Sequence, residues 1–180
     1  MKGSIADTEK KTSGKGDGNT LIVFFSWGGN TKGIAQEIQS QTDADLFEIE
    51  LVHPYSDDYD TVLDEAQRDQ NEQARPEIKN HVENMDQYST IILGYPNWWY
   101  SCPMAIFSFL EENDLSGKQV YLFCSHGTGG LASNVKDISV AIPDAKNSDS
   151  VFDVYEEDAA SAKDEIVEWI KKISAKELKK

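Results

Sequence analysis

The chain has few of the residues that mark several common protein classes. Its 180 residues include two cysteines, Cys102 and Cys124, and five prolines. Two cysteines do not form a disulfide framework, and no spacing of His and Cys suits a metal ion, so the sequence predicts no metal site and favours a reducing compartment. No apolar run approaches the ~20 residues that a membrane-spanning helix needs, so we expect no membrane insertion.

Positive charge is also scarce in this sequence. The chain has only two arginines, Arg68 and Arg75, and its formal net charge is −15. Binding to nucleic acid depends on basic patches that neutralise phosphates, so this charge excludes nucleic acid as an expected partner. An acidic surface instead suits steered docking to partner proteins with basic surfaces. An acidic surface that serves only for solvation is the alternative.

The first nineteen residues differ in composition from the remainder. They are rich in Lys, Gly, Ser, Thr and Asp and have almost nothing to bury, so residues 1–19 are predicted to be a flexible polar tail. Residues 20–180 are then one domain of ordinary size. The tail lacks the apolar segment of a signal peptide, so we expect a cytoplasmic protein. An exported or lipid-anchored protein is the alternative, if the tail follows a removed signal.

From residue 20 onward, strand-like and helix-like patterns alternate. Strands are expected at 20–26, 45–51, 90–94, 119–124 and 151–155. Helices are expected at 30–41, 56–74, 103–111, around 131–138 and at 159–173. Such alternation is typical of an α/β fold with a parallel sheet between two layers of helices. The sequence therefore predicts a single doubly wound, five-stranded parallel sheet of order 2-1-3-4-5 with helices on both faces.

In this strand order, ligands bind beyond the carboxyl ends of the first, third and fourth strands. The first strand ends in small, hydroxylated and glycine residues where a helix begins, which directs backbone N–H groups and a helix dipole at one point. We therefore expect an anion, most simply a phosphate, at Ser26, Trp27, Gly28, Gly29, Asn30 and Thr31. A tight turn with Asn30 as the helix cap is the alternative.

The other two strand ends also carry unusual residues. Three large aromatic side chains in a row cannot all enter one core, so at least one is expected to face solvent or a flat ligand. This loop consists of Pro96, Asn97, Trp98, Trp99 and Tyr100, with packing at the sheet edge as the alternative. The third loop lets backbone approach a ligand closely, unless it is an ordinary turn. It consists of Ser125, His126, Gly127, Thr128, Gly129 and Gly130.

With these three loops the chain resembles the flavodoxins, over roughly residues 20–174. Ser26, Gly28, Asn30 and Thr31 match the family's phosphate loop, and Pro96, Asn97, Trp98 and Trp99 match its first ring-binding loop. The third loop matches the second ring-binding loop through Ser125, Gly127 and Gly130, with His126 and Thr128 beside them. The resemblance implies a flavodoxin-like fold, non-covalent FMN and electron transfer with redox partner proteins.

The sequence also departs from the short-chain flavodoxins. Their first ring-binding loop often contains a glycine whose peptide flips toward the reduced flavin, and Trp98-Trp99-Tyr100 contains none. Trp27 stands where the family has a small or basic residue. His126 is expected either to contact the ring or to be an ordinary loop residue. Both cysteines are expected to be structural, because an acidic chain does not activate a thiol.

Three functions remain open at this point. The first is an FMN-binding electron carrier, and the second is an FMN-dependent oxidoreductase that reduces a quinone-like small acceptor, with the segment 56–80 as a cover. The third is a dinucleotide-binding protein, because Gly127 to Ala132 fits G-x-G-x-x-A and Asp153 follows the next strand. A shared fold does not decide between these functions.

Overall fold

The computed structural model describes residues 19–127 and 130–178, with side chains described as far as Ser174. The predicted tail therefore lies outside the described residues, apart from Asn19, and so do Thr128 and Gly129. No helix in the described part of the chain is long and apolar enough to cross a membrane. No group of three or more His, Cys, Asp or Glu side chains in that part could hold a metal ion.

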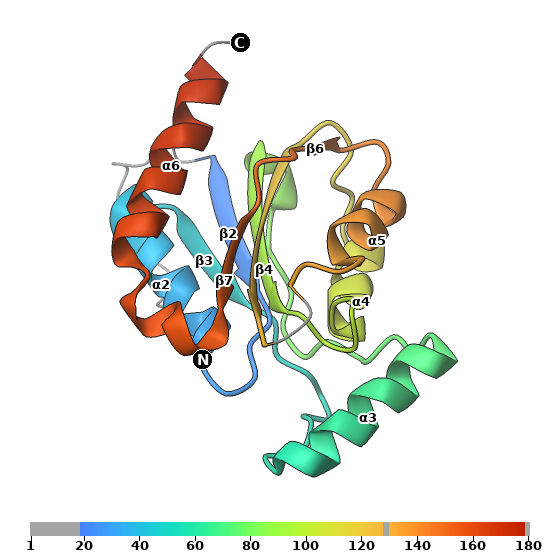
Figure 1. Ribbon diagram of the computed structural model, residues 1–180. Coiled ribbons are helices and arrows are strands. Elements are labelled where there is room, and N and C mark those ends of the chain that lie inside the picture. The colour runs from blue at the N-terminus through green and yellow to red at the C-terminus, as the bar shows by residue number, and fades with distance from the viewer. Residues whose placement is uncertain (1–18, 128–129, 179–180) are drawn as a thin grey trace.

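A parallel sheet forms the middle layer of the molecule (Figure 1). Its strands are β2 (Thr20–Phe24), β3 (Asp45–Glu48), β4 (Thr90–Pro96), β5 (Gln119–His126), β6 (Lys146–Asn147) and β7 (Phe152–Tyr155). The order is β3-β2-β4-β5, with β6 and β7 both paired to the outer edge of β5. This confirms the predicted doubly wound order. The sixth strand was not predicted, because β6 has two residues and both are exposed.

Helices cover both faces of the sheet. On one face lie α2 (Asn30–Thr42) and α6 (Lys163–Leu178), and on the other lie α4 (Met104–Glu112) and α5 (Asn134–Ala141). The helix α3 (Tyr59–Glu72) instead projects from the sheet's carboxyl end, away from both layers (Figure 1). Two short 3₁₀ helices, η1 (Met85–Gln87) and η2 (Glu156–Ser161), lead into β4 and follow β7.

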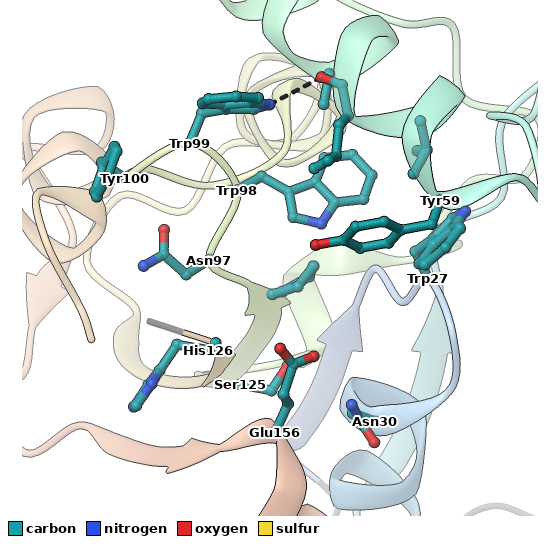
Figure 2. A pocket seen from close by; sticks show the side chains of 15 residues that line it. Trp27, Asn30, Tyr59, Asn97, Trp98, Trp99, Tyr100, Ser125, His126 and Glu156 are labelled. Carbon is teal, nitrogen blue, oxygen red and sulfur yellow. Dashed lines mark hydrogen bonds between the residues drawn. The ribbon is translucent and has the colours of Figure 1, made fainter. Parts of the chain in front are cut away.

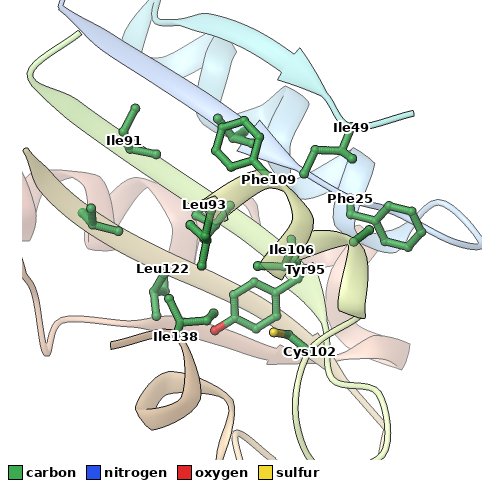
Figure 3. Packing of buried hydrophobic residues seen from close by; sticks show 14 of the residues in the cluster. Phe25, Ile49, Ile91, Leu93, Tyr95, Cys102, Ile106, Phe109, Leu122 and Ile138 are labelled. Carbon is green, nitrogen blue, oxygen red and sulfur yellow. The ribbon is translucent and has the colours of Figure 1, made fainter. Parts of the chain in front are cut away.

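The apolar strands are buried on both faces because alternate side chains enter opposite cores. Leu21 and Val23 pack on the α4 and α5 side, whereas Ile22 and Phe24 pack on the α2 and α6 side. Figure 3 shows the first of these cores, where Tyr95 and Cys102 lie beside Ile106 of α4. The two cores fix the strands, so the loops at their carboxyl ends start from rigid positions.

Most predicted elements shift by a few residues at their ends, such as the helix predicted around 131–138, which is α5 at Asn134–Ala141, and two elements differ more. The predicted strand 45–51 ends as β3 at Glu48, and Leu51 instead forms an isolated antiparallel bridge with Ile78. The predicted last helix is divided, because Ala159 lies in η2 and α6 begins only at Lys163. In both places the spacing of apolar residues indicated the right type of element. The backbone hydrogen-bonding pattern changes inside each predicted range, and the sequence pattern does not show that change.

Candidate functional site

The three loops predicted from the sequence meet at one pocket beyond the carboxyl ends of β2, β4 and β5 (Figure 2). The cavity has a volume of about 260 Å³. Residues from the predicted loops line most of it: Trp27, Asn30, Pro96, Asn97, Trp98, Trp99, Tyr100, Ser125, His126 and Gly127. Residues far apart in the sequence are therefore neighbours in space, as the strand order required.

The first loop forms an open helix N-terminus. Gly28 and Gly29 have φ angles of +85° and +98°, which residues with side chains adopt only at a cost. Gly29 is the N-cap of α2 and provides no side-chain cap, so Asn30 is the first helical residue and not the cap. The backbone N–H groups of Asn30 and Thr31 have no hydrogen-bond partner among the described residues, and α2 has no acidic residue in its first turn.

Two hydroxyl groups hold this loop in place. Ser26 Oγ accepts a hydrogen bond of 3.1 Å from the backbone N–H of Lys32. Thr31 Oγ1 lies 3.1 Å from Ser125 Oγ, and both residues are buried. The second hydrogen bond ties the first loop to the third. Ser26, Gly28, Gly29 and Thr31 therefore shape the turn without lining the pocket itself.

The second loop is a tight hairpin turn. Trp98 and Ser101 exchange two backbone hydrogen bonds, of 3.1 Å and 3.0 Å. The two residues between them have positive φ angles, +49° for Trp99 and +65° for Tyr100. Two-residue turns with positive φ at both positions normally use Asn-Gly, so the aromatic pair is strained. The turn directs aromatic side chains toward the pocket at a conformational cost.

The three tryptophans of the site have different surroundings. Trp27 Nε1 donates to the backbone oxygen of Ser56 at 2.9 Å, and Trp99 Nε1 donates to that of Leu63 at 2.9 Å. Trp98 packs edge-on against Tyr55 and Phe25, with ring centroids 5.2 Å and 5.7 Å away. Trp98, in the centre of Figure 2, thus has two aromatic neighbours, whereas Trp27 has one, the ring of Tyr59 with centroids 6.2 Å apart.

The third loop is held by side chains on both sides. His126 Nε2 lies 2.9 Å from Asp153 Oδ2 on β7, and because a carboxylate only accepts, Nε2 carries the hydrogen. Asn97 Nδ2 donates to the backbone oxygen of Gly130 at 2.6 Å. These contacts leave Asn97 Oδ1 and His126 Nδ1 buried without a hydrogen-bond partner among the described residues. Buried polar atoms without a hydrogen-bond partner are uncommon and are expected where a ligand belongs.

Some lining residues were not assigned to the site from the sequence. Glu156 belongs to an acidic run, residues 156–158, and its side chain points into the pocket (Figure 2). Four others come from α3: Tyr59, Val62, Leu63 and Ala66. The sequence shows these four residues at helical spacing within a polar segment. That spacing predicts an apolar helix face, but it does not distinguish a face packed in the core from one that lines a pocket.

The remaining predictions at this edge have clear outcomes. Cys102 and Cys124 are free and buried, and neither lines the pocket. Burial raises the pKa of the Cys124 thiol to about 12 and raises that of Cys102 further. The G-x-G-x-x-A segment does not open a helix, since α5 begins only at Asn134 and Ala132 has a φ of +46°.

Comparisons with known proteins agree with this architecture. A family model described as Flavodoxin matches residues 19–173. Flavodoxin 1 of Escherichia coli is 29% identical over 108 residues, which are 58% of this chain and 47% of that protein. The match thus spans about half the length of this relative.

Two solved structures share the fold. A flavoprotein from Lactobacillus acidophilus in complex with FMN is 24% identical, with a TM-score of 0.64 over 79% of this chain and 97% of that one. A flavodoxin from Fusobacterium nucleatum bound to flavin mononucleotide is 15% identical, with a TM-score of 0.56 over 88% of this chain and 98% of that one. The family model covers most of the sequence, and the chain therefore belongs to the flavodoxin family.

Proposed function

We propose that this chain binds FMN non-covalently in the pocket and transfers electrons through it. One observation carries the proposal: an open helix N-terminus and the indole of Trp98 border the same cavity. The first suits a phosphate and the second suits a flat ring, and FMN joins the two in one molecule. FMN supplies the redox chemistry when bound, and the protein positions and tunes it.

The phosphate end of FMN fits the first loop. The free N–H groups of Asn30 and Thr31, with the helix dipole of α2, form an anion site that needs no arginine. Gly28 and Gly29 let the backbone approach the phosphate. Ser26 shapes this turn through its hydrogen bond to Lys32, and Trp27 borders it, so we assign both residues to the phosphate site as well.

The ring end of FMN fits the second and third loops. A flavin ring has both an N–H group and carbonyl oxygens on its polar edge, so the N–H can donate to the buried acceptor Asn97 Oδ1, and His126 Nδ1 is a second buried atom that lacks a partner. Trp98 supplies a face for stacking, and Gly127 lets the ring lie close to the backbone. Pro96, Trp99, Tyr100, Ser125 and Gly130 complete the two loops, and we assign Thr128 and Gly129 to the site from the sequence alone.

The charges around the pocket predict a low reduction potential. Among the residues that the structure describes, no Lys or Arg lines the cavity, and Glu156 is the one carboxylate that does. A negative group near the ring opposes the gain of electrons, because the reduced ring is more negative. Electron exchange with redox partner proteins is the role that the family suggests for such a site.

Equilibrium titration with FMN and with riboflavin tests this proposal. Quenching of flavin fluorescence should report binding of FMN, and riboflavin should bind more weakly because it lacks the phosphate. Trp98→Ala should weaken FMN binding by about 1–3 kcal/mol through lost stacking, whereas Trp98→Phe should retain most of the affinity. Absence of FMN binding, or equal affinity for riboflavin, would contradict the proposal.

A further inference from the structure

The second loop holds a backbone shape that its own residues do not favour. Trp99 and Tyr100 have φ angles of +49° and +65° at the two central positions of the turn. Residues with side chains stay in such conformations only where their surroundings fix them. The side chain of Tyr100 is mostly exposed and gives little support. Trp99 is bonded to α3, which itself projects from the body of the domain (Figure 1), so a firmer anchor is needed elsewhere.

The beginning of α5 provides an anchor in the body of the domain. The backbone N–H of Ser133, the N-cap residue of α5, donates to the backbone oxygen of Tyr100 at 3.1 Å. Ser133 Oγ lies 2.8 Å from the same oxygen. The next residue, Asn134, is buried and accepts a hydrogen bond of 3.0 Å from the hydroxyl of Tyr95 on β4. The strained residue Tyr100 is therefore bonded to a helix end that is itself fixed to the sheet.

Asp137, in the first turn of α5, joins this anchor to the end of the turn. Its Oδ2 atom accepts a hydrogen bond of 2.6 Å from Ser101 Oγ and lies 2.9 Å from Ser133 Oγ. Ser101 closes the turn and is only 7% exposed. Hydrogen bonds to a carboxylate are stronger than those between neutral groups. One carboxylate oxygen thus contacts both Ser101 and the residue that holds Tyr100.

None of these three polar residues lines the cavity that we assign to FMN. Trp98, Trp99 and Tyr100 line it, whereas Ser101, Ser133 and Asp137 do not. No hydrogen bond given by the described residues joins Asp137 to the first loop either. Any influence of the Asp137 side chain on a ligand must therefore pass through the turn, and it must reach the ring end of the pocket.

We propose that Asp137 is a positioning residue, which holds the strained turn in its ring-binding shape before FMN enters. This inference rests on the proposed function, because the ligand concerned is FMN. A loop that is already ordered costs the ligand no free energy of ordering, so preorganisation raises the affinity. Without the carboxylate the turn should relax toward less strained conformations, in which Trp98 and Trp99 are not directed into the pocket.

Replacement of the carboxylate tests this role by flavin fluorescence. Asp137→Ala should weaken binding of FMN and of riboflavin by the same factor, about tenfold or about 1.4 kcal/mol, because both ligands carry the ring. Asp137→Asn keeps an oxygen that accepts from Ser101, so its loss should stay below about threefold. Asp144→Ala removes an exposed carboxylate beyond the other end of α5 and should have no effect.

Two results of these titrations would overturn the inference. The first is a loss below about threefold in Asp137→Ala, or an equal loss in Asp137→Asn, which would leave the hydrogen bond without a role. The second is a larger loss for FMN than for riboflavin, which would place the effect at the phosphate end.

Relief of the strain provides a test that general damage to the fold does not imitate. Glycine adopts positive φ without cost, so Tyr100→Gly should remove much of the strain that Asp137 opposes. In the Tyr100→Gly background, Asp137→Ala should therefore weaken FMN binding by less than about threefold, and the two substitutions should be non-additive. The full tenfold loss in both backgrounds would contradict a role through the turn.

Hydrogen exchange of the FMN-free protein keeps the two proposals distinguishable. The backbone N–H of Ser101 donates to Trp98 at 3.0 Å, and its exchange should rise about tenfold in Asp137→Ala but not in Asp144→Ala. Unchanged exchange in β4 and β5 shows that the variant folds. If Asp137→Ala does not fold, Ser101→Ala removes the same side-chain bond and should give the same result. Normal FMN binding with unchanged Ser101 exchange overturns this inference alone, and absence of FMN binding by the unsubstituted chain overturns the proposed function.

Discussion

Gly94 lies on β4 directly beneath the ring of Phe123 on β5. A Cβ atom at this position would lie 2.0 Å from Phe123 Cζ, which real contacts do not allow. The Gly94→Ala variant should therefore force the ring or the strands apart and lower the free energy of unfolding by about 1–3 kcal/mol. Urea denaturation followed by circular dichroism measures this loss.

Gly33 on α2 provides the control for that substitution. A Cβ atom there would meet nothing within 4 Å, and its φ is not positive. Gly33→Ala should therefore leave stability unchanged or raise it by up to about 1 kcal/mol, because alanine is the better helix residue. A similar loss in both variants would contradict the packing assigned to Gly94.

The cysteine thiols should be inert in the folded protein. The pKa of Cys124 is raised from 9.0 to about 12 by burial, and nearby Asp153 adds to the shift. At pH 8 neither cysteine should react with a disulfide reagent until the chain is unfolded by denaturant. Rapid reaction of either thiol under native conditions would contradict the burial described here.

The raised pKa of Cys124 determines the direction in which the stability of the protein changes with pH. The folded protein holds the Cys124 proton more tightly than the unfolded chain, so this contribution to stability is fully present below pH 9.0 and is lost as the pH rises toward 12. Partial burial and the hydrogen bond to Asp69 raise the pKa of the Tyr55 hydroxyl as well, which acts in the same direction. Unfolding midpoints measured between pH 8 and 10 should fall.

Glu156 shows what single residues in a sequence conceal. The acidic run that contains it has the composition of a solvated surface, and only the positions of β7 and η2 bring this one side chain to the pocket. The positions of Asn30, Trp98 and Gly127 at the pocket were predictable, because each lies in the loop that follows a recognisable strand or at its end. A side chain such as that of Glu156 reaches the site because of how a different element is placed in the fold, and no local sequence pattern indicates this.

At the scale of elements, the turn at Trp99 and Tyr100 has a strained backbone that lowers the free energy of unfolding. Positive φ angles cost residues with side chains about 1 kcal/mol or more each, and Tyr100 is 64% exposed, so little packing offsets the cost. Tyr100→Gly should raise the free energy of unfolding of the FMN-free protein by up to about 1 kcal/mol and leave the hairpin intact. Chemical denaturation checks this.

A second prediction at this scale concerns the indole hydrogen bonds that hold α3, and Ser56 just before it, at the pocket. Trp99→Phe keeps the aromatic ring but removes the hydrogen bond to Leu63. Loss of about 1 kcal/mol should raise hydrogen exchange of the α3 amides by roughly fivefold, with no change in β2 and β4. Exchange should rise in a comparable way in Trp27→Phe near Ser56. Unchanged exchange in both variants would show that α3 is held by other contacts.

Element types were predictable because hydrophobic periodicity differs between strands and helices. The buried strands β2, β4 and β5 were found as apolar runs, and α2, α3 and α4 were found as apolar stripes within three residues of their observed bounds. β6 was missed because a strand of two exposed residues has no period. The projecting direction of α3 was also not predictable, since it depends on two indole hydrogen bonds from distant loops.

For the whole molecule, the strand order is what brings the site together. Alternating elements with right-handed crossovers leave few topologies, and the doubly wound order places three loops at one edge. Chemistry was less accessible from the sequence, because the FMN assignment depends on resemblance and on geometry together. The extent of the tail and the cellular compartment stay predictions from the sequence.

The net charge of −15 leads to a prediction about electron transfer. Reduced, FMN-loaded protein should transfer electrons to the basic protein cytochrome c more slowly as salt increases, because screening weakens their attraction. The small anion ferricyanide provides the control and should react faster with added salt. Stopped-flow kinetics at two ionic strengths measures both rates. The same salt dependence for both acceptors would contradict electrostatic steering by the acidic surface.

A crystal structure of the chain grown with FMN tests the account most directly. It should show the phosphate at the backbone N–H groups of Asn30 and Thr31, and the flavin ring between Trp98 and the loop at Gly127. Density for FMN at another place on the molecule, or a flavin ring that does not touch Trp98, would contradict the assignment of this pocket.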